Sequence, residues 1–227
     1  IYYKNFYMSN IKIKLHKLDK NIIQFSISNI HIGLANGIRR ILISEIPTMA
    51  IDFATIITNT CCLHDNMIAQ RIGLIPFISD NASKFNYFWD TEDNKLTEVK
   101  YSLNVTNNSE NIIDVTSNDL KITDEENFIT YQKNIYKSVK PIITKYPIVI
   151  TKLAKGQSLH LTCSVRKGIS KEHAKFQPTS TVGYQITSEN NFLFTVETIG
   201  SLSPTSVVEQ ALDILSDKLS NISKHIN

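Results

Sequence analysis

Apolar and polar residues alternate near the start of the chain, and this period predicts strands. Every second residue is apolar within 11–15, and 23–27 repeats the alternation after a polar turn. A period of two places the apolar side chains on one face, so we expect a hairpin of two half-buried strands. The same period predicts strands at 158–165 and 192–196, and a short apolar run predicts another at 148–150.

Between the hairpin and Pro47 the apolar period changes to three and four residues, which predicts an amphipathic helix. Pro47 ends it, because proline cannot donate a helical hydrogen bond. Gly37 within the helix costs about 1 kcal/mol relative to alanine, so we expect a compensating close approach of another backbone. The apolar face holds Leu34, Ile38, Ile41 and Leu42, and Asn36, Arg39 and Arg40 fall largely on the polar side.

A second amphipathic helix is expected after Gly200. Ser203 can cap its first turn, and Pro204 suits the first helical position. Apolar residues then recur at spacings of four and three, about 3.5 residues per turn, which is typical of a coiled-coil seam. Such a seam needs a second surface to pack on. Its residues are Val208, Leu212, Leu215, Leu219 and Ile222.

The middle of the chain differs from both ends. We expect strands and loops there, with one short helix near 65–71. The stretch 89–127 is polar, acidic and rich in asparagine, which is typical of exposed loops between short strands. Because each end offers strands and an amphipathic helix, the middle has the character of an insertion between them.

Composition and motifs exclude several classes of protein. The 227 residues carry a net charge of +3, too mild for a dedicated nucleic-acid clamp. Three cysteines, two of them adjacent, cannot form a disulfide framework and indicate a reducing compartment. No apolar run approaches the roughly 18 residues needed to cross a bilayer. No nucleophile elbow, phosphate loop or His-Glu-x-x-His motif is present, so no catalytic residue is expected.

Charge is concentrated in the segment 166–178, which also contains a glycine, an aromatic residue and a proline. It is too charged to form core. Its pattern of glycine, phenylalanine and proline is too specific for a random loop, although a basic, solvated loop is the simpler interpretation of its charges. The charged residues are Arg166, Lys167, Lys171, Glu172, His173 and Lys175.

Four segments carry a resemblance to a known family, and they occur in that family's order. They are 33–52, with Asn-x-x-Arg-Arg followed by Glu-Ile-Pro-Thr, then 63–76, 85–89 and 155–178. Together they resemble the third-largest subunit of eukaryotic RNA polymerase II. The same family includes the archaeal D polypeptide and the bacterial alpha N-terminal region.

The resemblance implies an α+β fold, in which an antiparallel sheet carries two helices and a mainly β domain is inserted. A discontinuous dimerisation domain is expected at 9–47 and 182–226, with the inserted domain at 48–181. The implied role is a non-catalytic assembly subunit that pairs with a small alpha-like subunit, separate or fused, and scaffolds the second-largest and largest subunits. Small zinc-binding polymerase subunits are further expected partners, with DNA contacted only through the complex and no membrane involved.

The resemblance also assigns residues to contacts. One departure is His31, where relatives often carry an acidic cap; a neutral histidine is a poorer cap, so this helix is expected to fray or to be capped by Asn29. The implied dimer interface is Leu34, Ile38, Ile41, Leu42, Val208, Leu212, Leu215, Leu219 and Ile222. The implied large-subunit contacts are Asn36, Arg39, Arg40, Arg71, Lys167, Lys171, Glu172, His173 and Lys175.

No cofactor is expected. Many eukaryotic relatives carry a four-cysteine zinc loop after an aromatic run like 85–89, and some archaeal ones carry an iron–sulfur cluster. Here 90–97 contains no cysteine. Cys61, Cys62 and His64 supply at most three ligands, and adjacent cysteines lack the usual spacing of a zinc site.

Two other functions stay open, and so does the location. A stand-alone nucleic-acid-binding adaptor would use Arg39, Arg40 and 166–175, with steeply salt-dependent affinity. A thiol enzyme would need a reactive Cys163, but His160 lies three residues away in an alternating strand and so faces the opposite side. The nucleus is expected if the chain is cell-encoded. A version from a large DNA virus would act in cytoplasmic viral factories and the virion.

Overall fold

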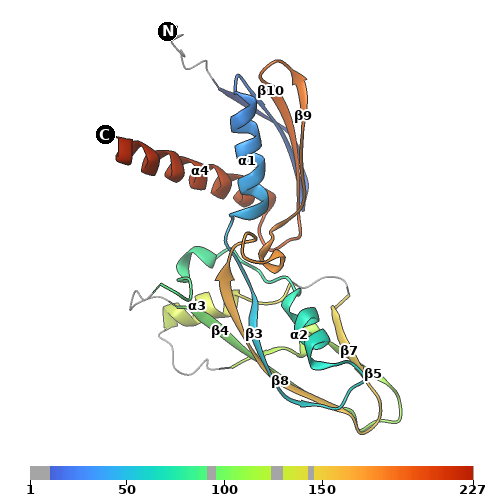
Figure 1. Cartoon of the computed structure of the whole chain (residues 1–227). Helices are drawn as coiled ribbons and strands as arrows, with labels where there is room; N and C mark the ends of the chain where they lie inside the picture. Colours follow the sequence, from blue (N-terminus) through green and yellow to red (C-terminus); the bar gives the residue numbers. More distant parts are fainter. Residues whose placement is uncertain (1–10, 91–95, 124–129, 143–145, 227) are drawn as a thin grey trace. The chain divides into compact units, whose positions relative to one another are not determined.

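The computed structural model describes residues 11–90, 96–123, 130–142 and 146–226, which form two compact units (Figure 1). The first unit combines both ends of the chain, up to Ile46 and from Gln177 onward, and the second spans Pro47–Phe176. The return to the first unit comes earlier than the expected residue 182, because the strand that rejoins its sheet already begins at Thr179.

A four-stranded antiparallel sheet forms the first unit, in the order β1-β2-β10-β9. The predicted hairpin is present as β1 and β2, and β2 also pairs with β10 from the other end of the chain. Across that pair the rings of Phe25 and Phe194 stack with centroids 5.2 Å apart. The strands are β1 (Lys12–Leu18), β2 (Ile22–Ser28), β9 (Thr179–Ser188) and β10 (Asn191–Thr198).

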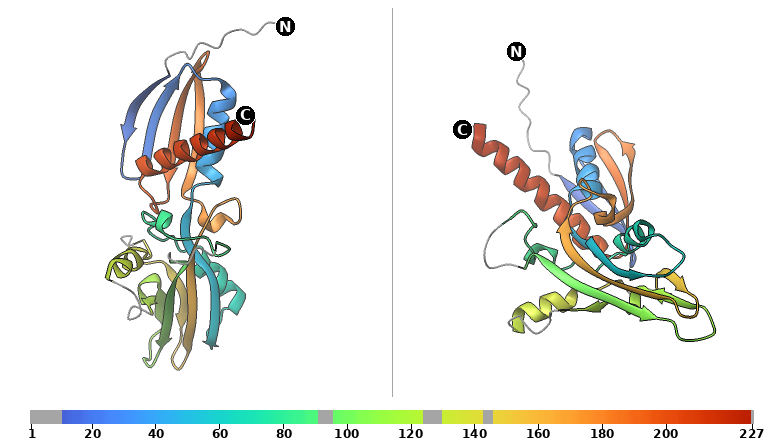
Figure 2. Two further views of the ribbon diagram at one scale, coloured as in Figure 1. Left: turned by 90° about the vertical axis from the view of Figure 1, so that its left-hand side faces the viewer. Right: turned by 60° about the horizontal axis from the view of Figure 1, so that its bottom comes forward.

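Two helices cover one face of this sheet (Figure 2). Helix α1 (Ile32–Ser44) packs against β9, and α4 (Pro204–Ile226) packs against α1, β10 and β2. An ion pair between Lys218 and Glu45 joins α4 to the end of α1. The two predicted helices therefore form the second layer of a two-layer sandwich of helices on an antiparallel sheet, with the apolar core between the layers.

Each helix start in this unit is capped by a side chain. The Nδ1 atom of His31 accepts a hydrogen bond from the Gly33 amide at 3.0 Å, so the expectation that α1 would fray or use Asn29 was wrong. Asn29 instead takes a left-handed conformation with φ 65° in the turn before the helix. The Ser203 hydroxyl accepts from the Ser206 amide at 3.2 Å, as the capping signal predicted.

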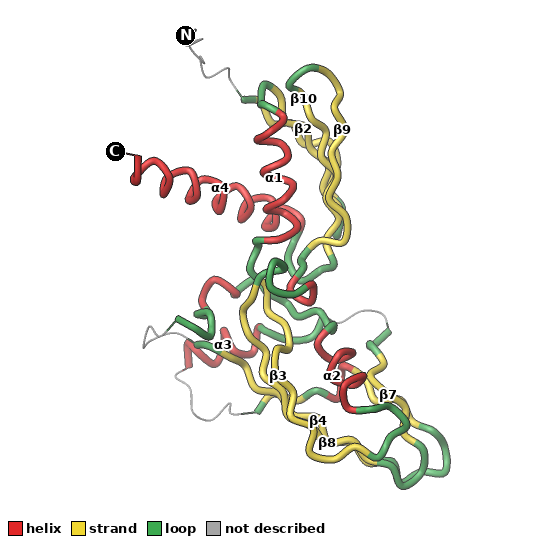
Figure 3. Tube along the Cα trace, in the orientation of Figure 1, coloured by secondary structure: helices red, strands yellow, loops and turns green. Residues whose placement is uncertain are grey.

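The second unit is mainly β (Figure 3). Its larger sheet is antiparallel in the order β3-β8-β4-β6, and β5 and β7 pair separately. Helix α2 packs on β3 and corresponds to the short helix predicted near 65–71. The elements are β3 (Thr48–Asn59), α2 (Asp65–Gly73), β4 (Glu98–Thr106), β5 (Ile113–Thr116), β6 (Lys121–Ile122), α3 (Thr130–Ser138), β7 (Val149–Leu153) and β8 (Ser158–Gly168).

Two elements of this unit differ from the expectation of polar loops. Strand β4 lies inside the stretch 89–127, and its Val99, Tyr101 and Leu103 are buried in the core. Helix α3 was not predicted, because its sequence is mostly polar. Among its residues whose burial the structure describes, Ile135 and Tyr136 belong to the core. The α+β class itself is confirmed, with antiparallel sheets throughout and a mainly β insertion.

The cap on α1 gives a stability prediction. Replacing His31 by alanine leaves the Gly33 amide without its acceptor, so His31→Ala should lower the free energy of unfolding by about 1 kcal/mol. His31→Asn keeps an acceptor at the cap and should stay close to the wild type. Urea unfolding of the three proteins measures the difference; equal stability of the alanine and asparagine variants would show that the cap contributes nothing.

Candidate functional site

The apolar face of α1 lies almost entirely inside the core of the first unit. Ile38, Ile41 and Leu42 expose 2%, 4% and 0% of their surface, and Leu34 is half-buried at the edge of the same core. Their burial against the unit's own sheet and α4 leaves little surface for a partner. Their first role is therefore to hold the helix on the sheet.

Helix α4 changes character along its length. Val207 and Ala211 are fully buried, and Val208, Leu212 and Leu215 are half-buried around them. Leu219 and Ile222, farther along the predicted seam, expose 56% and 57% of their surface. The sequence prediction missed Val207 and Ala211. The predicted seam, which starts at Val208, lies next to the face of the helix that packs on the core. The second half of α4 thus presents an apolar stripe to solvent.

A second apolar surface lies on the edge strand β1. Ile13 and Leu15 sit opposite Ile27 and Phe25, so all four point to the helix-bearing face of the sheet. The expectation that this strand is half-buried was wrong, because α1 and α4 pack over β9, β10 and β2 and β1 lies beyond them. We call this surface the edge patch; its members, 49% to 60% exposed, are Ile11, Ile13, Leu15 and Leu18.

The polar side of α1 carries the motif Asn-x-x-Arg-Arg. The Asn36 side-chain oxygen accepts hydrogen bonds from Arg39 Nε at 3.2 Å and Nη2 at 3.0 Å. Arg39 is therefore half-buried and held in place, whereas Arg40 is exposed. Of the two arginines, Arg40 is the one that faces solvent.

In the second unit, the aromatic run 85–89 and the basic segment 166–178 come together. Lys167 Nζ donates to the Phe85 carbonyl at 3.0 Å and lies 4.5 Å from the centre of the Tyr87 ring. Burial raises the pKa of Tyr87, and the negative charge of Glu172 raises it further. Two motifs that are far apart in the sequence thus form one surface.

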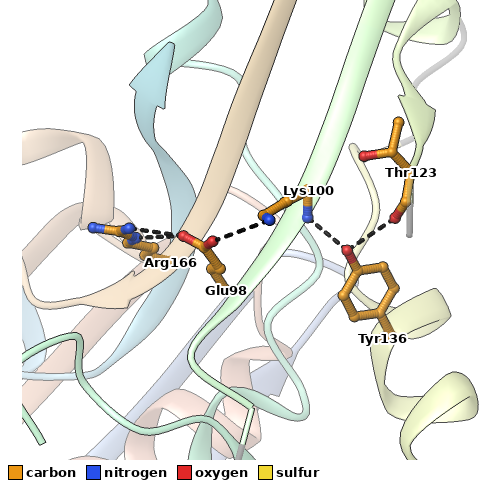
Figure 4. A network of polar contacts seen from close by, with 5 residues as sticks. All are labelled: Glu98, Lys100, Thr123, Tyr136 and Arg166. Atoms are coloured by element: carbon orange, nitrogen blue, oxygen red, sulfur yellow. Dashed lines mark hydrogen bonds and ion pairs between the residues drawn. The ribbon is translucent and has the colours of Figure 1, made fainter. Parts of the chain in front are cut away.

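Arg166 joins this surface to the sheet (Figure 4). Its Nε and Nη2 atoms donate to one Glu98 oxygen at 3.0 and 2.7 Å, and the other oxygen of Glu98 lies 3.9 Å from Lys100 Nζ. The guanidinium also lies 4.5 Å from the centre of the Phe53 ring. These contacts fix Arg166 in one orientation and leave its charge largely compensated.

The remaining charged residues of the segment divide into engaged and exposed ones. Lys175 Nζ pairs with Asp52 at 2.6 Å, and His173 Nδ1 accepts from the Lys175 amide at 3.0 Å. Lys171 and Glu172 are exposed. Arg71, on α2, donates to the Val149 carbonyl at 2.8 Å. Four of the six predicted contact residues in this unit therefore also support its fold: Arg71, Lys167, His173 and Lys175.

Within the basic segment, the backbone of Gly168 lies in tight contact with the ring of Phe176. A Cβ atom at position 168 would lie 2.5 Å from the Phe176 ring, which is itself buried. The Phe176 carbonyl accepts a hydrogen bond from Thr48 Oγ1 at 2.6 Å, on the strand paired with Gly168. Only glycine leaves room for this ring, which explains the glycine in the motif.

The thiols offer no support for an enzyme. Cys163 is 4% exposed, and burial raises its pKa from the ordinary 9.0 to about 12. On β8 it faces the core, and His160 faces the other side, as the strand period predicted. Cys61 is half-buried with its thiol 3.5 Å from the Leu63 carbonyl, and Cys62 is exposed.

The described part of the chain contains neither a candidate metal site nor a candidate membrane-spanning helix. No group of three or more histidine, cysteine, aspartate or glutamate side chains is arranged there to hold a metal ion. Residues 91–95 of the cysteine-free loop lie outside that part. No described helix is both long enough and apolar enough to cross a bilayer.

The sequence of the chain is similar to those of known proteins. Residues 24–219 match the family described as RNA polymerase Rpb3/Rpb11 dimerisation domain. The chain is 34% identical to a conjugation stage-specific protein of Tetrahymena thermophila over 80% of its own length and 61% of that protein's. It is 35% identical to DNA-directed RNA polymerase II subunit rpb3 of Dictyostelium discoideum, over 77% of the chain and 57% of the relative. The subunit RPB3 of Schizosaccharomyces pombe is 26% identical over 93% of the chain and 86% of its own length.

The contact at Gly168 leads to a packing prediction. Gly168→Ala forces the buried Phe176 ring to move and should lower the free energy of unfolding by about 1–3 kcal/mol. Gly37→Ala is the matched control, because nothing lies within 4 Å of the added methyl group; the close approach of another backbone expected at Gly37 is absent within the described residues. That control sits in a helix interior and should stabilise the protein by about 0.5–1 kcal/mol. Chemical unfolding distinguishes them; a Gly168→Ala protein as stable as wild type would contradict the contact.

The buried thiol leads to a labelling prediction. The raised pKa of Cys163 lowers its thiolate fraction at pH 8 by about a thousandfold, and the core also blocks access. Iodoacetamide should therefore modify Cys62 in the folded protein and reach Cys163 only after unfolding in urea. Peptide mass spectrometry reads both sites. Rapid modification of Cys163 in the folded protein would revive the thiol-enzyme interpretation.

Proposed function

Because the chain belongs to the RNA polymerase Rpb3/Rpb11 dimerisation-domain family, we propose that it is a non-catalytic assembly subunit of a multisubunit DNA-directed RNA polymerase. The chain spans about three fifths of the length of several relatives that it matches, so the role concerns the part they share. The observation that carries the proposal is the pair of uncovered apolar surfaces in the first unit: the edge patch and the second half of α4.

These two surfaces suit a partner with the same fold. Both belong to the helix-bearing side of the sheet, where the unit's own helices leave β1 uncovered. If two such domains pair about a two-fold axis, the free half of each α4 can cover the open sheet face of the other. Each square ångström of apolar surface buried contributes about 25 cal/mol, which favours pairing over exposure. A small alpha-like subunit, separate or fused, is the partner we propose.

The large subunits are the proposed partners of the polar surfaces. Arg40, Lys171 and Glu172 are exposed and available for direct contacts. Arg39 and Lys175 bind neighbouring side chains, so their proposed role is to shape those surfaces. The second-largest and largest subunits and small zinc-binding subunits complete the proposed assembly, with DNA contacted only through it.

Internal pairing of the cations argues against a stand-alone nucleic-acid adaptor. Such a protein gains affinity by offering cations to phosphates and releasing counterions. Here Arg166 is bound by Glu98 and Lys175 by Asp52, in line with the mild net charge of the chain. The assembly role uses the exposed Arg40 and Lys171 for contacts with protein and needs no array of free cations facing phosphates.

Cofactor and location follow from the same proposal. No bound zinc is proposed for this chain, because the loop that carries four cysteines in many relatives has none here. If the chain is cell-encoded, we propose that it acts in the nucleus. A virus-encoded version would act in cytoplasmic factories and the virion instead.

The proposal makes a prediction for α4. Leu219→Asp combined with Ile222→Asp should abolish recovery of the small alpha-like partner when the tagged chain is purified at high salt, a loss of about tenfold or more. Both residues are exposed, so the variant should still fold. Ser220→Asp adds a charge on another side of the same helix and should keep the partner.

Mass spectrometry of the eluates identifies what is retained. Recovery of a small alpha-like chain with the two largest polymerase subunits by the wild type supports the assembly role. A wild-type chain that elutes alone and monomeric would overturn it.

A further inference from the structure

A groove of about 470 Å³ lies within the second unit, between β3 and α2. Small residues line both walls: Ala54 on the strand, and Ala69 and Gly73 on the helix. Phe53 and Leu74 form its rim and expose 57% and 56% of their surface. Large apolar residues beside a hollow lined by small ones are typical of a docking site for a side chain.

One wall of the groove is rigid. The Phe53 ring lies under the guanidinium of Arg166, which Glu98 holds through two hydrogen bonds. On the other wall, α2 lies in ordinary van der Waals contact with β3 at Gly73, where an added Cβ would lie 3.7 Å from the Ile51 carbonyl oxygen. The groove is therefore formed before any ligand binds, which lowers the entropic cost of docking.

The strand beside the groove has an open edge. In the order β3-β8-β4-β6, β3 pairs with β8 on one side, and no described strand pairs with it on the other. An edge strand presents backbone N–H and C=O groups that can pair with an added extended segment. An open edge next to an apolar groove fits an occupant that is itself a strand.

The charged residues that line the groove indicate which kind of segment can bind there. Asp52 and Lys175, which both line the groove, form an ion pair at 2.6 Å with side chains only 25% and 12% exposed. The two charges compensate each other, so the groove favours an apolar, uncharged segment over a phosphate or an acidic peptide.

We propose that an extended apolar segment of another polymerase subunit adds to the free edge of β3 as a strand and inserts apolar side chains into this groove. The proposal rests on the assembly role proposed above, but it concerns a different surface from the edge patch and α4. The partner that pairs with the first unit should therefore bind independently of this groove.

A bulky residue in the groove tests the proposal. Ala69→Trp fills the hollow, and Met67→Trp is the matched control, because Met67 is exposed on the same helix and does not line the groove. When the tagged full chain is purified from its native source, Ala69→Trp should retain the small alpha-like partner. It should reduce recovery of one further polymerase subunit by about tenfold or more. Leu74→Glu, at the exposed rim, should cause the same loss without adding bulk to the helix wall.

A cross-link identifies the segment. A photoreactive amino acid at Gln70, which lines the groove, should join the wild-type chain to an apolar segment of that same subunit within the assembled complex. Backbone amides of 54–57 should exchange more slowly in the complex than in the chain with its small partner alone. Cross-links to a second copy of this chain, to nucleic acid or to a small molecule would overturn the proposal.

The two proposals fail in different ways. A wild-type chain that recovers no polymerase subunit removes the assembly role. A wild-type chain that recovers the full set, together with Ala69→Trp and Leu74→Glu variants that recover it equally well, removes only the groove.

Discussion

The pairing of β2 with β10 is the constraint on which the rest of the structure depends. It joins Ile22–Ser28 to Asn191–Thr198, and the stacked rings of Phe25 and Phe194 lie across it. The loop entropy of closing so long a connection rises only slowly with its length, so a complete inserted unit is tolerated. Once the two strands pair, α1 and α4 have a common sheet face to pack on.

The same topology leaves apolar surface uncovered. Two helices cover three strands of the first sheet, so the face of β1 stays open, and α4 continues past the sheet it packs on. In the second unit, β3 is an edge strand with a groove beside it. A monomeric protein rarely exposes so many large apolar residues in groups. These groups of exposed apolar residues are consistent with membership of a dimerisation-domain family.

The basic segment has a structural role before any contact role. Arg166 is bound by Glu98, Lys175 by Asp52, and Gly168 makes room for the Phe176 ring. Each contact joins the segment to the strands of the second unit. Cations in such a motif can thus serve to form ion pairs within the protein. The positive charge of the motif by itself is therefore a poor guide to nucleic-acid binding.

The sequence by itself determined the class of the fold, the hairpin, both long helices with the Ser203 cap, and the family. These follow from local periods and motifs, which depend on residues close together in the chain. It did not determine whether an apolar face is covered: Ile13 is exposed, although its alternation resembles that of the buried Ile27. The tertiary structure decided that coverage, the role of His31 as a cap, and the meeting of 85–89 with 166–178. The physical reason is that a period shows which side of an element is apolar, whereas its burial depends on elements that are distant in sequence.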